Sequence, residues 1–282
     1  MLIPKILAML VEQNQIIKML KFTKMNALGN DFIIIDQCFK NNLIEISPAS
    51  IKKLCDRKNI GCDQLIIIKN TDEIDTICQM LIYNQDGTES ATCGNATRCV
   101  AGLIFLQNPN LNSIKIQTKA GILDAKKISN KIIKVNLGSP KMLKENLNLE
   151  GFNFYHCDIG NPHSVTFVSE LPNDEIFFQT APKIEANTLI FPHKTNVEFA
   201  KIIDDSKIEV RVFERGVGET LACGSGACAV AFIAMFLQKI NTKITTISFK
   251  GGDLQIEFDG KNIFMIGDYS QIFEGTIDEN FL

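Results

Sequence analysis

Two short cysteine-led segments, far apart in the chain, are variants of one pattern. They are CGNATRC at Cys93–Cys99 and CGSGAC at Cys223–Cys228. In each segment a glycine and a small polar residue follow the first cysteine, and a run rich in Ala, Val, Ile and Leu comes next. Such a run is typical of a helix that buries most of its surface. The repeat therefore predicts two similar halves, each with an apolar helix that begins just after its cysteine.

This position gives the two cysteines a chemical bias. Cys93 and Cys223 are expected at helix N-termini, where unpaired backbone N–H groups and the positive end of the helix dipole favour negative charge. A thiol there is biased toward thiolate, and a carboxylate can be held beside it. If the two helix ends face each other, they flank one anionic substrate with two groups that transfer protons.

Charge and cysteine content argue against several classes of protein. The 282 residues include 29 Lys and Arg against 32 Asp and Glu, a net charge of −3, which predicts neither a nucleic-acid nor an anionic membrane partner. Nine cysteines, without a CxxC repeat of zinc-type spacing, favour reduced thiols in the cytoplasm. With only three histidines, we expect no metal site.

The first 18 residues have some features of a targeting segment. Their apolar run at 6–11 is short, and a polar stretch follows it without a small-residue cleavage site. We interpret residues 1–18 as a dispensable extension, with a true start at Met19 or Met25 as one explanation. No other apolar run approaches the roughly 20 residues of a membrane span.

Runs of β-branched and aromatic residues between turn signals predict a chain made mostly of strands. Strands are expected in the first half over 32–36, 64–69, 77–84, 114–118 and 131–137. In the second half they are expected over 154–159, 164–168, 196–203, 208–213, 245–249, 253–258 and 262–266. Helices are expected over 50–58, 94–106, 174–186 and 224–238. The second and fourth helices have too little polar surface for exposure, so we expect sheet to wrap them.

Four polar clusters stand at the ends of expected strands. They are GNDF at 29–32, GCDQL at 61–65, Asn84 with the turn after it, and GNPHS at 160–164. Turn chemistry alone explains any one of them. Together they supply Asn and Gln side chains, whose donors and acceptors suit a ligand that carries both ammonium and carboxylate groups.

The segment ERGVGET adds charged groups just before the second cysteine. Arg215 is suited to bidentate capture of a carboxylate and Glu214 to an ammonium group. A surface ion pair is the alternative interpretation.

Six motifs occur in a characteristic order: GNDF, CGNxxR, GNPH, NVEF, ERGxGET and ACGSGA. In this order and spacing, the chain resembles the diaminopimelate epimerase family from about Lys21 to its C-terminus. Proline racemases and hydroxyproline epimerases of the same superfamily lack the asparagine set and ERGxGET.

The resemblance implies an α/β fold of the α+β type with two pseudo-symmetric domains. Each would be a β-barrel-like sheet around a central helix, with the active site in the cleft between them. We expect an N-terminal domain over 19–137, a C-terminal domain over 138–269, and a final strand over 270–282 that returns to the first domain. The turn residues Gly138, Ser139 and Pro140 are the expected hinge between the halves. A homodimer is also implied.

The implied activity is that of an isomerase. It would interconvert LL- and meso-2,6-diaminopimelate on the bacterial route to lysine and peptidoglycan, without pyridoxal phosphate or another cofactor. The residues agree on the last point, because no glycine-rich phosphate loop follows a strand and opens a helix in the required way.

The resemblance also assigns roles to individual residues. Cys93 and Cys223 would be the two bases, which work on opposite faces of the α-carbon, with His163 and Glu214 assisting them. The residues implied to hold the reacting carboxylate through backbone N–H groups are Gly94, Asn95, Gly224 and Ser225. The side chains implied to contact substrate are Asn30, Gln64, Asn84, Asn161, Asn196, Glu214 and Arg215.

Two departures and two rival functions remain open. Ala96 stands where the family usually has glycine, which suits a helical turn but not a positive φ. Phe273 stands where many relatives have a tyrosine associated with dimer contacts. One rival is another cofactor-independent amino-acid racemase or epimerase. The other is a redox or metal-binding module in which Cys93 and Cys223 form a disulfide or bind metal.

Overall fold

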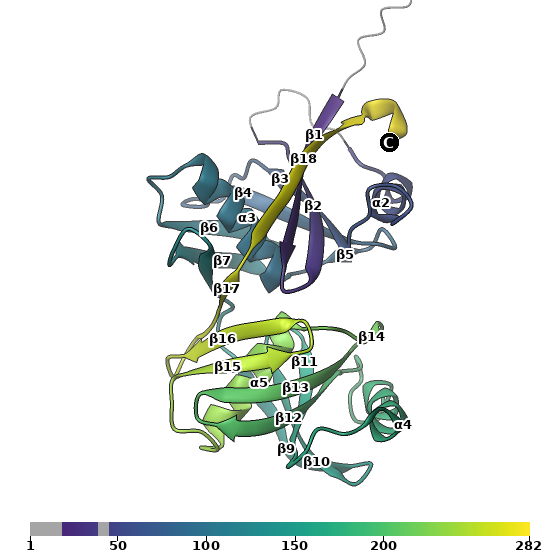
Figure 1. The fold of residues 1–282 in the computed structure, drawn as a ribbon, viewed down its shortest axis with the longest axis vertical. Coiled ribbons are helices and arrows are strands. Elements are labelled where there is room, and N and C mark those ends of the chain that lie inside the picture. Colours follow the sequence, from purple (N-terminus) through teal and green to yellow (C-terminus); the bar gives the residue numbers. More distant parts are fainter. Residues whose placement is uncertain (1–18, 39–44) are drawn as a thin grey trace, which may run out of the picture.

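The computed structural model describes residues 19–38 and 45–282, which form two halves stacked along the long axis of the molecule (Figure 1). The expected extension over 1–18 lies outside the described residues. The first half contains β1 (Met19–Ala27), β2 (Asn30–Asp36), α2 (Pro48–Cys55), β3 (Gln64–Lys69), β4 (Cys78–Asn84), β5 (Glu89–Ser90), α3 (Gly94–Gln107), β6 (Ser113–Thr118), β7 (Gly121–Lys127) and β8 (Ile132–Asn136).

After one additional strand, the second half repeats this order of elements. It contains β9 (Lys141–Leu149), β10 (Phe152–Asp158), β11 (Pro162–Phe167), α4 (Asp174–Glu185), β12 (Asn196–Asp204), β13 (Lys207–Glu214), β14 (Gly218–Glu219), α5 (Gly224–Phe236), β15 (Ile244–Phe249), β16 (Gly252–Phe258) and β17 (Ile263–Asp268). The strand β18 (Ser270–Asp278) and a 3₁₀ turn (Glu279–Phe281) end the chain. The expected α/β fold with two similar halves is confirmed.

Strand pairing follows the same scheme in both halves. β2 pairs in parallel with β3, as β11 does with β12. β4 pairs in parallel with β6, as β13 does with β15. The register places Phe32 opposite Gln64 and His163 opposite Asn196. Equivalent strand ends in the two halves therefore present side chains at equivalent edges.

Two strand pairings tie the halves together. β8 and β17 pair antiparallel at the junction. After β8 the chain turns at Gly138, which has φ +85°, and β9 pairs with β10 in the second half. After β17 the chain crosses back, and β18 runs antiparallel along β1 (Figure 1). The first half therefore contains one strand, β18, that follows the second half in the chain.

The two central helices are almost wholly enclosed by sheet. Every residue from Gly226 to Ala234 of α5 is buried, and four of them are alanines, which let the strands approach closely. Helix α3 is buried from Asn95 to Phe105. The shorter helices α2 and α4 cover outer faces and complete two smaller apolar clusters. The central helices are therefore held firmly, with their first turns directed at the junction.

Helix ends differ slightly from the sequence prediction over 50–58. Helix α2 begins at Pro48, two residues earlier, because Ser47 caps it by accepting a hydrogen bond from the Ser50 N–H. It ends at Cys55, since Asp56 adopts an extended backbone. The loop after α2 leads directly into β3 and the first half of the candidate site.

Candidate active site

The N-termini of the two central helices meet at one methionine. A β-carbon added at Gly94 or at Gly224 would lie 2.6 Å from Cε of Met265 in β17. The same atom added at Gly224 would lie 3.3 Å from Oδ1 of Asn95. The first turns of α3 and α5 therefore lie close together, against the same Met265 side chain.

Cys93 and Cys223 are the N-cap residues of these helices. The Sγ of Cys223 accepts a hydrogen bond from the Gly226 N–H at 3.3 Å and lies 3.5 Å from the Ser225 hydroxyl. The Sγ of Cys93 lies 4.0 Å from Oδ1 of Asn30. Two thiols thus stand at two converging helix ends, each in contact with polar groups.

The pKa values of both thiols are raised, whereas their position at helix N-termini alone predicts that they are lowered. Burial raises the pKa of Cys93, although the N–H groups of Ala96 and Asn95 and the charge of Arg98 act to lower it. Burial also raises the pKa of Cys223, and the carboxylates of Glu214 and Glu198 add to the effect. The cost of placing a charge in this apolar surrounding outweighs the helix end.

A buried acid–base pair stands beside Cys223. Nδ1 of His163 lies 2.6 Å from Oε1 of Glu198, and both side chains are fully buried. A β-carbon added at Gly226 would lie 2.9 Å from Oε1 of Glu198 and 3.4 Å from Sγ of Cys223. The pair therefore adjoins the thiol, and burial raises the pKa of Glu198 while His163 opposes that shift.

Sequence reasoning did not select Glu198, although it lies in the NVEF motif. Its signal was an acidic residue on a strand whose neighbours Val197 and Phe199 are apolar and buried. A carboxylate at such a position needs a partner. Here the partner is His163, which the parallel pairing of β11 with β12 brings alongside.

In the first half, the predicted polar residues gather at the ends of β2, β3 and β4. Nε2 of Gln64 donates to Oδ1 of Asn84 at 3.0 Å. Nδ2 of Asn30 donates to Oδ2 of Asp63 at 3.0 Å, which leaves the Asn30 carbonyl toward Cys93. These amides are therefore held by neighbours on the same sheet edge.

In the second half, the predicted residues form an equivalent set. Nδ2 of Asn161 lies 3.4 Å from the Ser225 hydroxyl, and its Oδ1 lies 3.1 Å from Nε2 of His163. Oδ1 of Asn196 accepts a hydrogen bond from the Arg215 N–H at 3.0 Å. Asn161 thus connects the histidine to the first turn of α5.

The charged pair Glu214 and Arg215 is not an ion pair in this structure. Glu214 accepts a hydrogen bond from the Thr220 hydroxyl at 2.5 Å, whereas Arg215 donates to the carbonyl of His193 at 3.0 Å. The two side chains are therefore held separately, as two different ligand groups would require.

Several buried polar atoms at the site lack hydrogen-bond partners among the described residues. They are Oε1 of Gln64, Oδ1 of Asn95 and Oε2 of Glu198. Unpaired buried polar atoms are uncommon in folded proteins, and these three are free to accept hydrogen bonds from a ligand or from water. Within the described part of the chain, no group of His, Cys, Asp and Glu has the arrangement to hold a metal ion.

The fold accommodates Ala96 and Phe273, the two residues that depart from the family pattern. Ala96 is the third residue of α3, has a helical backbone and is fully buried. No positive φ is needed there. Phe273 packs edge-on against Phe22 at 5.9 Å between ring centroids and remains 46% exposed.

No helix in the described residues is long and apolar enough to cross a membrane.

Comparisons with known proteins match most of the chain to one family. A family model described as diaminopimelate epimerase matches residues 22–143 and 155–272. The diaminopimelate epimerase of Acetivibrio thermocellus is 37% identical over 289 residues, which cover 93% of this chain and 100% of that protein. The diaminopimelate epimerase of Pelotomaculum thermopropionicum is 36% identical over 279 residues, which cover 90% and 97%.

Solved structures of low identity share the fold. A protein described as a predicted epimerase from Pseudomonas aeruginosa has a TM-score of 0.70 and 12% identity, covering 92% of this chain and 99% of that one. A hydroxyproline epimerase from Agrobacterium vitis has a TM-score of 0.67 and 9% identity, covering 92% and 91%. At these identities the likeness shows the architecture alone.

Proposed function

The chain belongs to the diaminopimelate epimerase family, and from this premise we propose that Cys93 and Cys223 exchange the proton at one α-carbon of 2,6-diaminopimelate. Such an enzyme is an isomerase that interconverts the LL and meso forms, a reaction that serves lysine biosynthesis. The observation that carries the assignment of the bases is the meeting of two cysteine-capped helix ends at Met265.

The two thiols divide the proton transfer between them. One thiolate removes the α-proton from one face, and the opposing thiol delivers a proton to the other face, which inverts the centre. The enzyme then holds one thiol and one thiolate again, with their identities exchanged. No cofactor takes part in this scheme.

The first turns of α3 and α5 stabilise the charge that builds on the substrate. We place the reacting carboxylate between the backbone N–H groups of Gly94 and Asn95 on one side and of Gly224 and Ser225 on the other. Donors fixed in advance in a dry site stabilise a developing anion more strongly than water does. The convergence of the two helix ends supports this placement.

The neutral amides and the charged pair bind the distal end of the substrate. Asn30, Gln64 and Asn84 supply one wall, and Asn161 and Asn196 supply the other. Arg215 then captures the distal carboxylate and Glu214 the ammonium group. Their separate hydrogen bonds support two different ligand groups.

We further propose a cytoplasmic homodimer, supported by the exposed apolar side chains of Ile272 and Phe273 on β18.

The proposed function is tested with LL-diaminopimelate in deuterated water, with reductant and without cofactor. Chiral chromatography and mass spectrometry should find the meso form with deuterium at the inverted centre. No conversion by folded, reduced protein would contradict the proposal. Racemisation assays across other amino acids then distinguish a different substrate from a non-enzymatic role.

Glu198 acts as a positioning residue for His163, and its removal gives a measurable prediction. Glu198→Gln keeps the shape of the side chain but removes its charge. A hydrogen bond to a charged group contributes about 1.5–3 kcal/mol, so kcat should fall roughly 10- to 100-fold with little change in KM. Steady-state kinetics measure both constants.

Two further variants control this measurement. Glu198→Asp retains the carboxylate and should recover part of kcat, which a purely structural loss would not show. Glu257→Gln removes a carboxylate that pairs with Lys134 at 2.6 Å, away from the thiols, and should leave kcat near the wild-type value. A folded Glu198→Gln enzyme with wild-type kcat would rule out the positioning role.

A further inference from the structure

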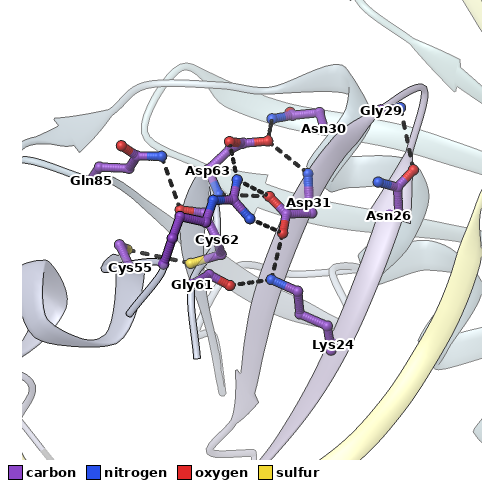
Figure 2. A network of polar contacts seen from close by, with 11 residues as sticks. Lys24, Asn26, Gly29, Asn30, Asp31, Cys55, Gly61, Cys62, Asp63 and Gln85 are labelled. Carbon is purple, nitrogen blue, oxygen red and sulfur yellow. Dashed lines mark hydrogen bonds and ion pairs between the residues drawn. The ribbon is translucent and has the colours of Figure 1, made fainter. Parts of the chain in front are cut away.

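A second pair of thiols lies outside the candidate active site. Cys55 is the last residue of α2, and Cys62 stands two residues before β3. Their Sγ atoms are 3.3 Å apart, and Cys62 donates the hydrogen bond to Cys55 (Figure 2). The Cys62 N–H also donates to the Cys55 carbonyl at 3.2 Å, so the two main chains run close together. A disulfide bond is about 2.05 Å long, and the sulfurs need to approach by only about 1.2 Å.

The two thiols differ in their tendency to ionise. The hydrogen bond from Cys62 places the pKa of Cys55 below its ordinary value, and the charges of Lys24 and Arg57 act in the same direction against burial. The same hydrogen bond and burial raise the pKa of Cys62. A thiol that ionises more readily, beside a thiol that stays protonated, is the arrangement in which one sulfur attacks an oxidant and the other resolves the product.

A short surface loop covers the pair. Asp56, Arg57, Lys58 and Asn59 are all exposed, while Cys55 and Cys62 are 2% and 0% exposed. The loop residues 56–59 carry no apolar side chain, and polar contacts hold them, such as the hydrogen bond from the Asn59 amide to the Lys53 carbonyl. Local opening of such a loop costs far less free energy than unfolding, and it would admit a small oxidant.

An ion network connects this loop to the candidate active site. Arg57 binds both Asp31 and Asp63 at 2.6 Å. Lys24 joins the network through Asp31 and the Gly61 carbonyl (Figure 2). Asp63, the residue after Cys62, accepts the hydrogen bond from the Asn30 amide. A displacement of Cys62 therefore reaches Asn30 through one residue and one hydrogen bond.

We propose that Cys55 and Cys62 form a reversible disulfide in the presence of hydrogen peroxide, and that this bond weakens substrate binding by displacing Asp63 and Asn30. The Cys55 thiolate attacks one peroxide oxygen and becomes a sulfenic acid, while the other oxygen leaves as hydroxide. The Cys62 sulfur then attacks the sulfenic sulfur, and its proton leaves with the displaced hydroxide as water. In total, two thiols and one peroxide give one disulfide and two waters, and a dithiol reverses the step.

The disulfide is tested by peptide mapping of the full-length protein. The reduced protein is treated with hydrogen peroxide, quenched with catalase, alkylated and digested without reductant. Mass spectrometry should find a peptide that contains a Cys55–Cys62 disulfide and loses it on treatment with dithiothreitol. The buried Cys78→Ser variant keeps the pair and should give the same peptide. Absence of the cross-link in folded, peroxide-treated wild-type protein would overturn the proposal.

The effect on binding rests on the proposed function and is read from KM. Loss of one hydrogen bond predicts that KM for diaminopimelate rises about twofold to tenfold in the cross-linked enzyme. Oxidation of Cys93 or Cys223 lowers kcat instead, so the two effects are separable. The Cys55→Ser/Cys62→Ser variant should keep its KM after peroxide. A cross-linked enzyme with unchanged KM would overturn the coupling to binding, and an enzyme inactive on diaminopimelate before oxidation would refute the proposed function alone.

Discussion

Cys93→Ser and Cys223→Ser are each expected to lose epimerisation of diaminopimelate by roughly 10²- to 10⁴-fold, the usual contribution of a positioned acid or base. A serine hydroxyl fits at either helix end but ionises far less readily than a thiol, so one of the two proton transfers fails. Conversion of LL to meso substrate measures the loss. Cys78→Ser, which replaces a buried thiol away from the helix ends, is the matched control and should retain turnover.

The isotope pattern of these variants distinguishes two bases from one. An enzyme with a single thiol can still remove and return the proton on the face where that thiol stands. One isomer should therefore take up deuterium from solvent without inversion, while the other isomer should not exchange. The two variants should show opposite preferences for the LL and meso forms. Exchange of the same isomer by both variants would contradict thiols on opposite faces.

Much of the fold was predictable because its strands carry strong local signals. The expected strands over 64–69 and 196–203 match β3 and β12 within one residue, since apolar β-branched and aromatic residues dominate both. The two central helices were placed by their apolar runs and by the cysteines before them. Strand β1 was not among the expected strands, although Leu20 and Phe22 alternate with more exposed residues and are buried.

Other strands gave little local signal. In β9 no residue is buried, and in β7 only Ala125 is. Such strands are held by backbone pairing with neighbours, which a periodicity of apolar residues does not report. The return of the chain along β1 depends on contacts some 250 residues apart, for example Leu20 opposite Ile277. That pairing has no local signature.

The chemistry of the site was predictable in residue type and less so in environment. Position at a helix end favoured thiolate for Cys93 and Cys223, but burial reverses that bias. The burial of the two thiols depends on how the two halves pack together, which no short sequence motif predicts. Glu198 was missed for the same reason, because its role depends on a histidine that reaches it across a parallel pair of strands.

The activity is expected to rise steeply with pH, because the raised pKa values of both thiols make thiolate scarce near neutrality. The productive enzyme holds one thiolate and one thiol. Below the first ionisation of the pair, kcat/KM should climb about tenfold per pH unit, and it should fall once the second thiol also ionises. The two macroscopic pKa values belong to the pair, since the first charge opposes the second. Measurement from pH 6 to pH 10 tests the ascending limb of this profile, and a kcat/KM that does not change over this range would contradict the expectation.

Substitution of Glu214 should shift the pH profile of the activity in a defined direction. Its carboxylate raises the pKa of Cys223, after burial, and also that of Cys93. Glu214→Gln removes this negative charge, so the acidic limb should move to lower pH even though kcat itself falls. The rate of iodoacetamide alkylation at Cys93 and Cys223, followed by mass spectrometry without substrate, should move in the same direction. Since alkylation requires thiolate and involves no ionisation of diaminopimelate, an unmoved alkylation profile would show that Glu214 does not act on the thiols.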